Sequence, residues 1–344
     1  MEKQDLLSMT PPELEEFLAG QPKFRAKQLF DWLHVKKETE FSRMSNLPKS
    51  LISLLEERAE LVFLKQRKKL VSQIDGTVKY LFELPDGEWV ESVVMQYEHG
   101  RSICISTQVG CKMGCSFCAS TKAGFVRNLR PSEILAQIYA AQTDLGERIG
   151  HVVLMGIGEP LDNYDNVLRF LELVSAEQGN NLSLRNLSLS TCGLVDRIYD
   201  LAEKRLGLTL SVSLHAPNDR IRNQTMPVSL RWPMEELLEA CRYYMEKTGR
   251  RVSFEYALIR GFNDSEEAAL ELAARLKGML CHVNLIPVNE IRETDYRKSE
   301  KKQVADFQAL LLKKGVNTTV RRTLGSDISA ACGQLRRETI NEEE

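Results

Sequence analysis

The chain has 344 residues, of which 43% are hydrophobic and 27% are charged, and its formal net charge at pH 7 is −2. This length and composition are typical of a soluble protein with one large catalytic domain and an appended module. They exclude a membrane-spanning protein, because no apolar run reaches roughly 20 residues, and a generally basic nucleic-acid binder, because the charges are balanced.

The N-terminal region carries helix signals and no secretory signal sequence, so we expect a cytoplasmic protein. Thr10 is the predicted cap of a helix that opens at Pro11. A second, amphipathic helix begins near Phe24, and a third is predicted over 48–59.

Two β-like runs follow, over 78–84 and 89–95, and Pro85-Asp86-Gly87 between them is a turn signal. The two runs therefore predict a β-hairpin. We interpret residues 1–97 as a separate accessory domain.

From residue 102 the pattern becomes an alternation of short apolar strands and amphipathic helices. Strands are predicted at 102–106, 151–155, 186–191, 208–215, 252–259, 282–288 and 317–322. Helices are predicted at 132–145, 165–178, 194–205, 234–247, 265–279 and 299–314. The alternation predicts an α/β fold with a parallel sheet, either an open doubly wound sheet or an incomplete barrel. This core is expected over 98–330, and a C-terminal tail over 331–344.

Polar residues collect at the carboxyl ends of these strands, where parallel α/β folds place their chemistry. A cysteine-rich loop follows the first strand. Further along the chain, the strand ends carry Gly158, Glu159, Ser190, His215 and Asn289. For any one of them, an ordinary polar strand end is an equally good interpretation, but their shared position indicates a site.

Three of the eight cysteines, Cys111, Cys115 and Cys118, fall within eight residues. In a reducing compartment such a group indicates metal binding rather than disulfides. No fourth Cys or His lies nearby, so a closed zinc site is the weaker alternative. A [4Fe–4S] cluster held by three cysteines leaves one iron open for a substrate or cofactor.

The Cys-x3-Cys-x2-Cys loop after the first strand resembles the signature of the radical S-adenosylmethionine superfamily. The resemblance implies a partial (β/α)6 barrel and a [4Fe–4S] cluster whose open iron binds S-adenosylmethionine. It also implies that one electron cleaves this cofactor to a 5′-deoxyadenosyl radical. The segment Gly156-Ile157-Gly158-Glu159-Pro160 matches the superfamily segment that contacts the methionine amino group.

Three further segments, 106–111, 213–218 and 326–335, resemble the RlmN/Cfr family of radical S-adenosylmethionine RNA adenine methyltransferases. The likeness runs over nearly the whole chain. The third segment is the most discriminating, because it places Cys332 in a tail where a cluster ligand has no reason to be.

The resemblance implies a role for three residues outside the cluster. Cys332 would receive a methyl group from one S-adenosylmethionine, and the radical from a second would activate that methyl for addition to the base. Cys104 matches the thiol that resolves the resulting adduct through a transient disulfide, and Glu91 matches the base that removes the ring proton. From the residues alone, Cys104 is a buried strand cysteine and Glu91 a solvent-facing charge.

The same matching implies which residues bind the two cofactors. The contacts to S-adenosylmethionine are Gly158, Glu159, Ser190, Ser213, Leu214, His215 and Asn289. The iron ligands are Cys111, Cys115 and Cys118. The remaining cysteines, Cys192, Cys241 and Cys281, match nothing in the mechanism and are predicted to pack in the core.

The implied substrates are an adenosine of 23S rRNA and an adenosine beside the tRNA anticodon, both methylated at C2. Pro160 and Ala216 favour this branch over the Cfr-like branch that methylates C8. A flavodoxin-type electron donor and a monomer are expected. Basic segments that could contact RNA, or be ordinary solvated faces, are 65–69, Arg127, Arg130, 321–322 and 336–337.

Two other functions remain open from the sequence. One is a radical S-adenosylmethionine enzyme with different chemistry, such as peptide modification, which predicts no methyl group on Cys332. The other is a non-catalytic cluster or zinc protein that only binds RNA, which predicts no 5′-deoxyadenosine after reduction.

Overall fold

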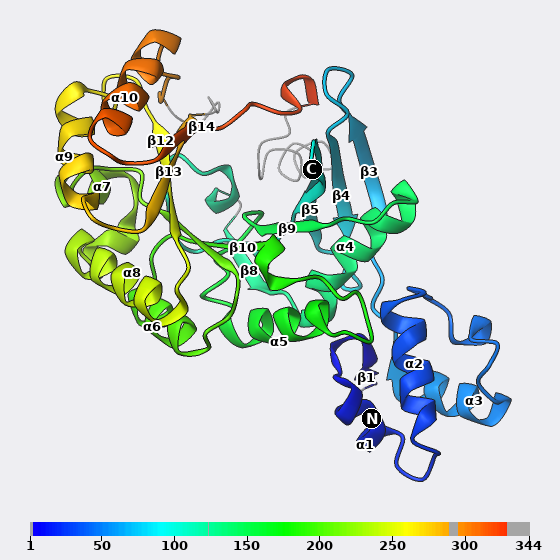
Figure 1. The fold of residues 1–344 in the computed structure, drawn as a ribbon. Helices are drawn as coiled ribbons and strands as arrows, with labels where there is room; N and C mark the ends of the chain where they lie inside the picture. Colours follow the sequence, from blue (N-terminus) through cyan, green and yellow to red (C-terminus); the bar gives the residue numbers. More distant parts are fainter. Residues whose placement is uncertain (1–2, 123, 289–294, 329–344) are drawn as a thin grey trace.

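A helical N-terminal lobe lies beside a larger α/β body in the computed structural model of the chain (Figure 1). The structure describes residues 3–122, 124–288 and 295–328. Within these ranges, no helix is long and apolar enough to cross a membrane.

The lobe consists of short helices that bury their leucines. Helix α1 (Pro11–Phe17) begins at a capping box, because the Glu13 carboxylate accepts hydrogen bonds from the Thr10 backbone N–H and hydroxyl at 2.7 and 2.8 Å. Helices α2 (Phe24–His34) and α3 (Lys49–Arg58) follow, as predicted. Strands β1 (Gln4–Asp5) and β2 (Ala59–Glu60) pair in parallel and join the two ends of the lobe.

The body is organised around one ten-stranded sheet with the order β14-β13-β12-β11-β10-β9-β6-β5-β4-β3. Its parallel part runs from β6 to β14. The strands of that part are β6 (Gly100–Cys104), β9 (His151–Leu154), β10 (Leu187–Thr191), β11 (Thr209–Ser213), β12 (Val252–Leu258), β13 (Cys281–Pro287) and β14 (Thr318–Val320). All seven lie where the alternating pattern predicted them.

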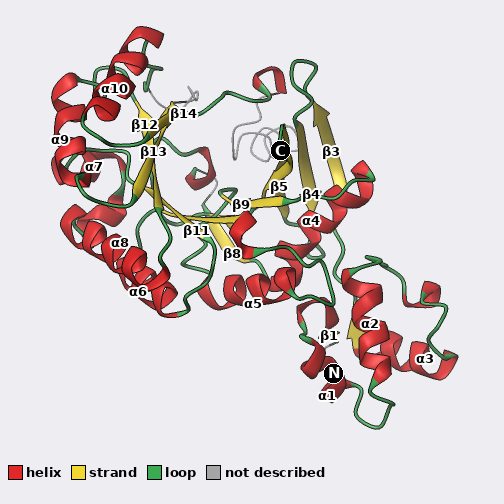
Figure 2. Cartoon of the chain, viewed as in Figure 1, coloured by secondary structure: helices red, strands yellow, loops and turns green. Residues whose placement is uncertain are grey.

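Helices cover one side of this sheet and leave the other side facing inward, as the ribbon and the secondary-structure colouring both show (Figures 1 and 2). These helices are α4 (Pro131–Leu145), α5 (Tyr164–Ser175), α6 (Val195–Glu203), α8 (Met234–Thr248), α9 (Glu266–Leu276) and α10 (Lys301–Lys313). The sheet curves without closing, which confirms the predicted partial (β/α)6 barrel. Buried leucines, valines and isoleucines from the strands and these helices form a continuous core.

An antiparallel extension continues the sheet beyond β6. Strands β4 (Val78–Glu83) and β5 (Trp89–Tyr97) form the predicted hairpin, and β5 pairs directly with β6. Strand β3 (Lys65–Val71) forms the outer edge. The boundary expected at residue 97 therefore falls between two strands that are hydrogen-bonded to each other in one sheet.

Three elements near the site were not predicted from the sequence. Strands β7 (Gln108–Gly110) and β8 (Phe125–Asn128) form a small ribbon, and helix α7 (Asp219–Thr225) follows β11. All three are shorter than eight residues, too short to show a period in the sequence. They matter because they surround the cysteine loop.

Candidate functional site

The cysteine loop is held at both ends by the β7–β8 ribbon. The Cys111 N–H donates to the Gly124 carbonyl at 3.1 Å. Gly110 has a φ of +74°, and a Cβ there would lie 1.8 Å from the Gly124 carbonyl oxygen. Only glycine fits at this position, so the tight entry to the loop depends on it.

The loop buries the thiols of Cys111 and Cys115 and leaves Cys118 partly exposed. Burial, together with the nearby Cys118 and Glu159, raises the pKa of the Cys111 thiol to about 12. A bound cation would reverse this by stabilising the thiolates.

The donor set fits an iron–sulfur cluster better than a single metal ion. No group of three Cys, His, Asp or Glu side chains in the described ranges lies close enough to hold one ion. In a [4Fe–4S] cluster each cysteine binds a different iron, so the thiols need not meet at one point. Cys111, Cys115 and Cys118 therefore suit such a cluster.

The loop after β9 packs tightly against the loop after β6. A Cβ on Gly156 would lie 2.5 Å from the Ile105 carbonyl oxygen, and one on Gly158, at a φ of +109°, would lie 2.6 Å from the Gln108 side chain. The Glu159 N–H donates to the Gln108 side-chain oxygen at 2.9 Å. These glycines allow Gly158 and Glu159 to lie beside the cysteine loop.

The Glu159 carboxylate is buried and reaches the end of β10. One oxygen accepts from the Cys192 N–H at 2.7 Å and the other from the Leu161 N–H at 3.0 Å. Burial raises the pKa of Glu159, while these hydrogen bonds oppose the shift. The carboxylate is thus fixed in position at the carboxyl end of the parallel sheet.

His215, just after β11, is buried and held in a left-handed backbone conformation with a φ of +56°. Its Nδ1 accepts from the Ala257 N–H at 2.9 Å. Burial, helped by the charge of Arg222, lowers the pKa of His215 to about 3. The neutral ring therefore carries its proton on Nε2. Its edge contacts Phe117, from the cysteine loop, with ring centroids 4.9 Å apart.

Strand register places most of the other predicted residues on one face of the sheet. Paired residues point to the same face, so Cys104 shares a face with Val93 on one side and Val153 on the other. Continuing across the register, the same face carries Glu91, Cys104, Ser190, Ser211 and Ser213. Leu214 is fully buried just after β11, next to His215.

Glu91 is not solvent-facing as the residues alone suggested, because only 3% of its side chain is exposed. Its carboxylate lies 3.2 Å from the ammonium group of Lys79, whose side chain is fully buried. Lys79 on β4 and Glu91 on β5 share the face that carries Cys104. A buried ion pair thus lies beside the predicted resolving thiol.

Two of the predicted site residues, Asn289 and Cys332, lie outside the described residues. The chain just before the tail is well anchored, however. Asp327 accepts from the Ser72 hydroxyl at 2.7 Å, and Asp75 accepts from the Gly325 N–H at 2.8 Å. Leu324 packs against the cluster of Val93, Met95 and Cys104. The last described segment therefore reaches the face that carries Glu91 and Cys104.

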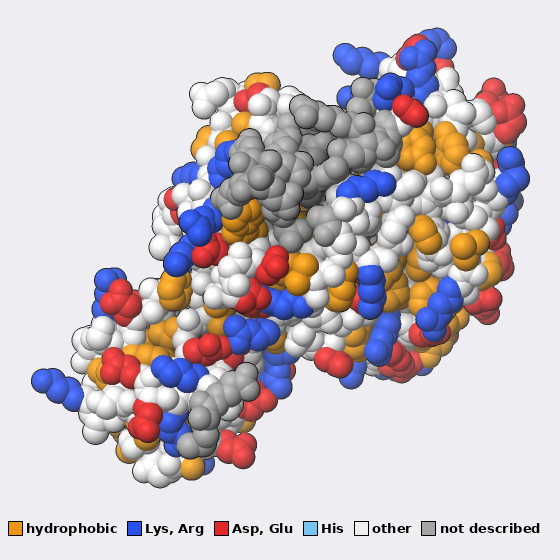
Figure 3. Space-filling view, turned by 180° about the vertical axis from the view of Figure 1, so that it is seen from behind, with side chains coloured by type: hydrophobic (Ala, Val, Ile, Leu, Met, Phe, Trp, Pro, Cys, Tyr) orange, Lys and Arg blue, Asp and Glu red, His pale blue; other side chains and the backbone are white. Residues whose placement is uncertain are grey.

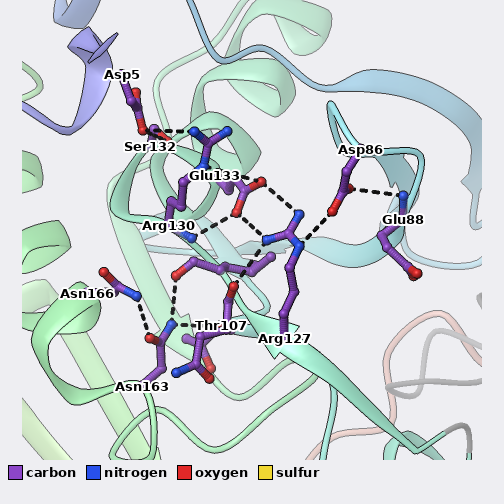
Figure 4. A network of polar contacts seen from close by, with 12 residues as sticks. Asp5, Asp86, Glu88, Thr107, Arg127, Arg130, Ser132, Glu133, Asn163 and Asn166 are labelled. Carbon is purple, nitrogen blue, oxygen red and sulfur yellow. Dashed lines mark hydrogen bonds and ion pairs between the residues drawn. The ribbon is translucent and has the colours of Figure 1, made fainter. Parts of the chain in front are cut away.

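The predicted RNA-contacting arginines after the cysteine loop are already engaged in a structural network (Figure 4). Arg127 pairs with Asp86 at 2.7 Å and with Glu133 at 2.8 Å. Arg130 pairs with Glu60 at 2.5 Å. The network joins the lobe, the hairpin turn and the start of α4.

Basic residues elsewhere are mixed with acidic ones. On β3, Lys65 lies 3.9 Å from Glu83 and Lys69 lies 2.6 Å from Asp144. Arg321 and Arg322 are exposed just before the tail. On the face shown in Figure 3, Lys and Arg side chains are interspersed with Asp and Glu.

Sequence reasoning missed two buried cations at the site, Lys79 and Arg222. Lys79 interrupts the apolar run of β4, two residues before Leu81, which pairs with Glu91 across the hairpin. This interruption could have indicated an internal ion pair. Arg222 lies on the short helix α7 and carries no such signal. The free thiols of Cys192, Cys241 and Cys281 pack in the apolar core, as predicted.

Two family descriptions match the chain. Residues 105–273 match the Radical SAM superfamily, and residues 4–61 match the ribosomal RNA large subunit methyltransferase N-terminal domain. The first match begins in the loop after β6 and ends within α9. The second coincides with the helical lobe.

Similar proteins cover nearly the whole chain. A probable dual-specificity RNA methyltransferase RlmN of Alkaliphilus oremlandii is 54% identical over 99% of this chain and 99% of its own length. One of Clostridium novyi is 52% identical over 98% and 99%. The crystal structure of a radical SAM methyltransferase from Sphaerobacter thermophilus is similar with a TM-score of 0.92 and 42% identity, covering 96% of this chain and 98% of that one.

Proposed function

Because the chain belongs to the RlmN family of radical S-adenosylmethionine RNA methyltransferases, we propose that it methylates C2 of adenosine 2503 in 23S rRNA and of adenosine 37 in tRNA. The family implies a [4Fe–4S] cluster and S-adenosylmethionine. Two molecules of S-adenosylmethionine would be used per turnover, because one methylates Cys332 and the other supplies the radical. A flavodoxin-type protein would donate the electron to the monomeric enzyme.

The strongest support for this proposal is the position of the segment that leads to Cys332. Glu91 and Cys104 lie on the same face of the sheet, and Leu324, eight residues before Cys332, packs against Cys104. A methyl-carrying cysteine so close in sequence to this segment can reach both side chains, because eight extended residues span up to about 28 Å.

Cys111, Cys115 and Cys118 would hold the cluster, which supplies the electron that cleaves S-adenosylmethionine. Glu159 and the Nε2–H of His215 offer an acceptor and a donor beside that loop. Backbone hydrogen bonds fix the Glu159 carboxylate in position, and burial holds the His215 ring neutral.

Glu91 would accept the proton that leaves the ring carbon of the base. Lys79 lies beside the carboxylate as its counter-ion. The adduct would also have to return its unpaired electron to the cluster, which leaves a closed-shell thioether. The Cys104 thiolate would then attack the sulfur of Cys332, which breaks the bond between that sulfur and the ring-bound methylene carbon, and that carbon would take up a proton to become the new methyl group. The two cysteines are left as a disulfide, and cellular thiols would reduce it.

Methyl mapping of RNA from cells with and without this protein tests the substrate and the ring position. We expect C2 methylation of both adenosines to disappear with the gene. A lost methyl group at C8 would overturn the branch assignment, which depends on Pro160 and Ala216.

Mass spectrometry of the purified protein tests the role of Cys332. We expect a methyl group on Cys332, and complete loss of transfer to RNA in Cys332→Ala. Cys281→Ala, which removes a core thiol, should keep activity. An unmethylated Cys332 in protein with an intact cluster would contradict the mechanism.

A further inference from the structure

Arg222 is a fully buried arginine at the carboxyl ends of β10 and β11. Its Nη2 donates to the Cys192 carbonyl at 2.7 Å and to the Ser213 carbonyl at 3.3 Å, and its Nε donates to the Leu214 carbonyl at 3.2 Å. None of its side chain is exposed to solvent. The guanidinium thus lies where the predicted cofactor-binding segments meet.

No carboxylate in the described part of the chain lies within ion-pair distance of Arg222, and its buried Nη1 has no hydrogen-bond partner there. An arginine remains protonated in proteins, so this is a buried positive charge that only neutral carbonyls solvate. Such a charge is costly to bury unless a negative group lies nearby. Among the residues that the structure describes, no carboxylate provides that group as an ion pair.

The cysteine loop, whose thiols would bind a cluster as thiolates, packs against the helix that carries Arg222. Helix α7, which carries Arg222, ends at Thr225, and the Thr225 carbonyl accepts a hydrogen bond from the Ser116 N–H at 2.9 Å. Ser116 follows Cys115 directly.

We propose that Arg222 is the buried countercharge of the iron–sulfur cluster and makes the cluster easier to reduce. Three thiolates bring net negative charge to the loop, and the electron taken from the donor adds another. A fixed cation stabilises the more negative, reduced state, because net charge near a cluster sets its potential. This inference rests on the cluster of the proposed function but not on the RNA substrate.

A purely structural role is the competing explanation. In that case Arg222 only holds the ends of β10 and β11 together through the three carbonyls. The two roles differ in one respect, because the countercharge role needs the positive charge while the structural role needs the forked geometry of the guanidinium. Lysine keeps the charge and loses the fork, so it separates them.

The experiment compares Arg222→Gln and Arg222→Lys with the wild-type chain and with Arg220→Gln. Arg220 lies on the same helix but is exposed, so its removal subtracts the same charge where water screens it. Each protein is reconstituted anaerobically with iron and sulfide, and its iron content and circular dichroism are measured. The midpoint potential is then determined by a redox titration followed by electron paramagnetic resonance, without RNA or S-adenosylmethionine.

We expect Arg222→Gln to disfavour one-electron reduction by about tenfold, a shift of about −59 mV. Arg222→Lys and Arg220→Gln should stay close to wild type. Arg222→Gln could also fail to hold the cluster while Arg222→Lys binds it with the wild-type potential. That result would likewise support the proposal, because it shows that the cluster needs the positive charge at this position. Three results would overturn the proposal. The midpoint potential could be unchanged in Arg222→Gln, it could shift by the same amount in Arg222→Lys, or Arg222→Lys could fail to hold the cluster.

This outcome is independent of the methylation test. A chain that binds no cluster at Cys111, Cys115 and Cys118 contradicts the proposed function itself. A chain that methylates RNA but shows no dependence of its potential on Arg222 contradicts only the inference about Arg222.

Discussion

Lys79 and Glu91 show what burial means for single residues at this site. Both side chains are excluded from water, and the two charged groups lie 3.2 Å apart. A buried pair of this kind contributes little net stability, but removing one partner leaves the other charge buried and uncompensated, which is destabilising. The pair therefore fixes the Glu91 carboxylate on the face that it shares with Cys104.

We predict that Lys79→Met lowers the free energy of unfolding by about 3–5 kcal/mol, because the buried Glu91 carboxylate loses the ammonium group beside it. The double variant Lys79→Met/Glu91→Leu should recover most of this loss. Urea unfolding followed by circular dichroism measures both. Lys65→Met, which changes an exposed lysine at the sheet edge, serves as the control. If Lys79→Met is as stable as the wild-type chain, the Lys79 ammonium group does not stabilise the buried Glu91 carboxylate.

At the scale of elements, the described contacts join the lobe to the body through a few side chains. One connection is His34 on α2, whose Nδ1 lies 3.0 Å from the Tyr139 hydroxyl on α4. Another is the network around Glu133, at the start of α4, which joins the arginines that contact Glu60 in the lobe and Asp86 in the hairpin turn (Figure 4). His34, Tyr139 and Glu133 are buried, whereas Arg130 and Glu60 are partly exposed and Asp86 is exposed.

The His34 connection predicts a pH dependence. Burial lowers the pKa of His34 to about 3, so the unfolded chain, with a pKa near 6.5, binds the proton more readily. The contribution of His34 to stability is complete above pH 6.5 and declines as the pH falls from 6.5 towards 3. By pH 5 the loss is about 2 kcal/mol. Urea unfolding at pH 7 and pH 5 should show a smaller difference in His34→Gln than in wild type; an equal difference would refute this assignment.

The Glu133 network predicts an effect on the lobe. Glu133→Ala removes a carboxylate that contacts Arg127 at 2.8 Å and accepts from the Arg130 N–H at 2.8 Å. We expect a loss of about 3 kcal/mol in the free energy of unfolding. Limited proteolysis should also cut faster between the lobe and β3. Glu147→Ala, which removes an exposed partner of Arg101, should change neither measurement.

At the scale of the whole molecule, distant segments meet at the face that carries Glu91 and Cys104. The turn between β3 and β4 binds Gly325 and Asp327, about 250 residues later in the chain. The antiparallel extension thus contributes Glu91 and Lys79 and also anchors the segment that leads to Cys332. In the proposed mechanism, this arrangement gives the extension a catalytic role and not only an accessory one.

We predict that Asp327→Ala slows methyl transfer to RNA by about tenfold while Cys332 is still methylated. The reason is that Asp327 accepts hydrogen bonds from Ser72 and from the Gln73 N–H, and without them the segment before Cys332 is less restricted. Single-turnover transfer with pre-methylated protein measures the effect. Asp306→Ala on α10 is the control, and an unaffected rate in Asp327→Ala would contradict the anchoring role.

The sequence by itself determined the alternation of parallel strands and helices and the position of the cysteine loop, because apolar periodicity and residue spacing are local properties of the chain. The cofactors followed from the resemblance of that loop to a known superfamily. The sequence also indicated which residues end the strands. Only the tertiary structure decided that the hairpin extends the barrel sheet, that Glu91 is paired with Lys79 inside the protein, and that Arg222 lies behind the cysteine loop. These facts depend on register and packing between segments far apart in sequence, and no single segment carries that information.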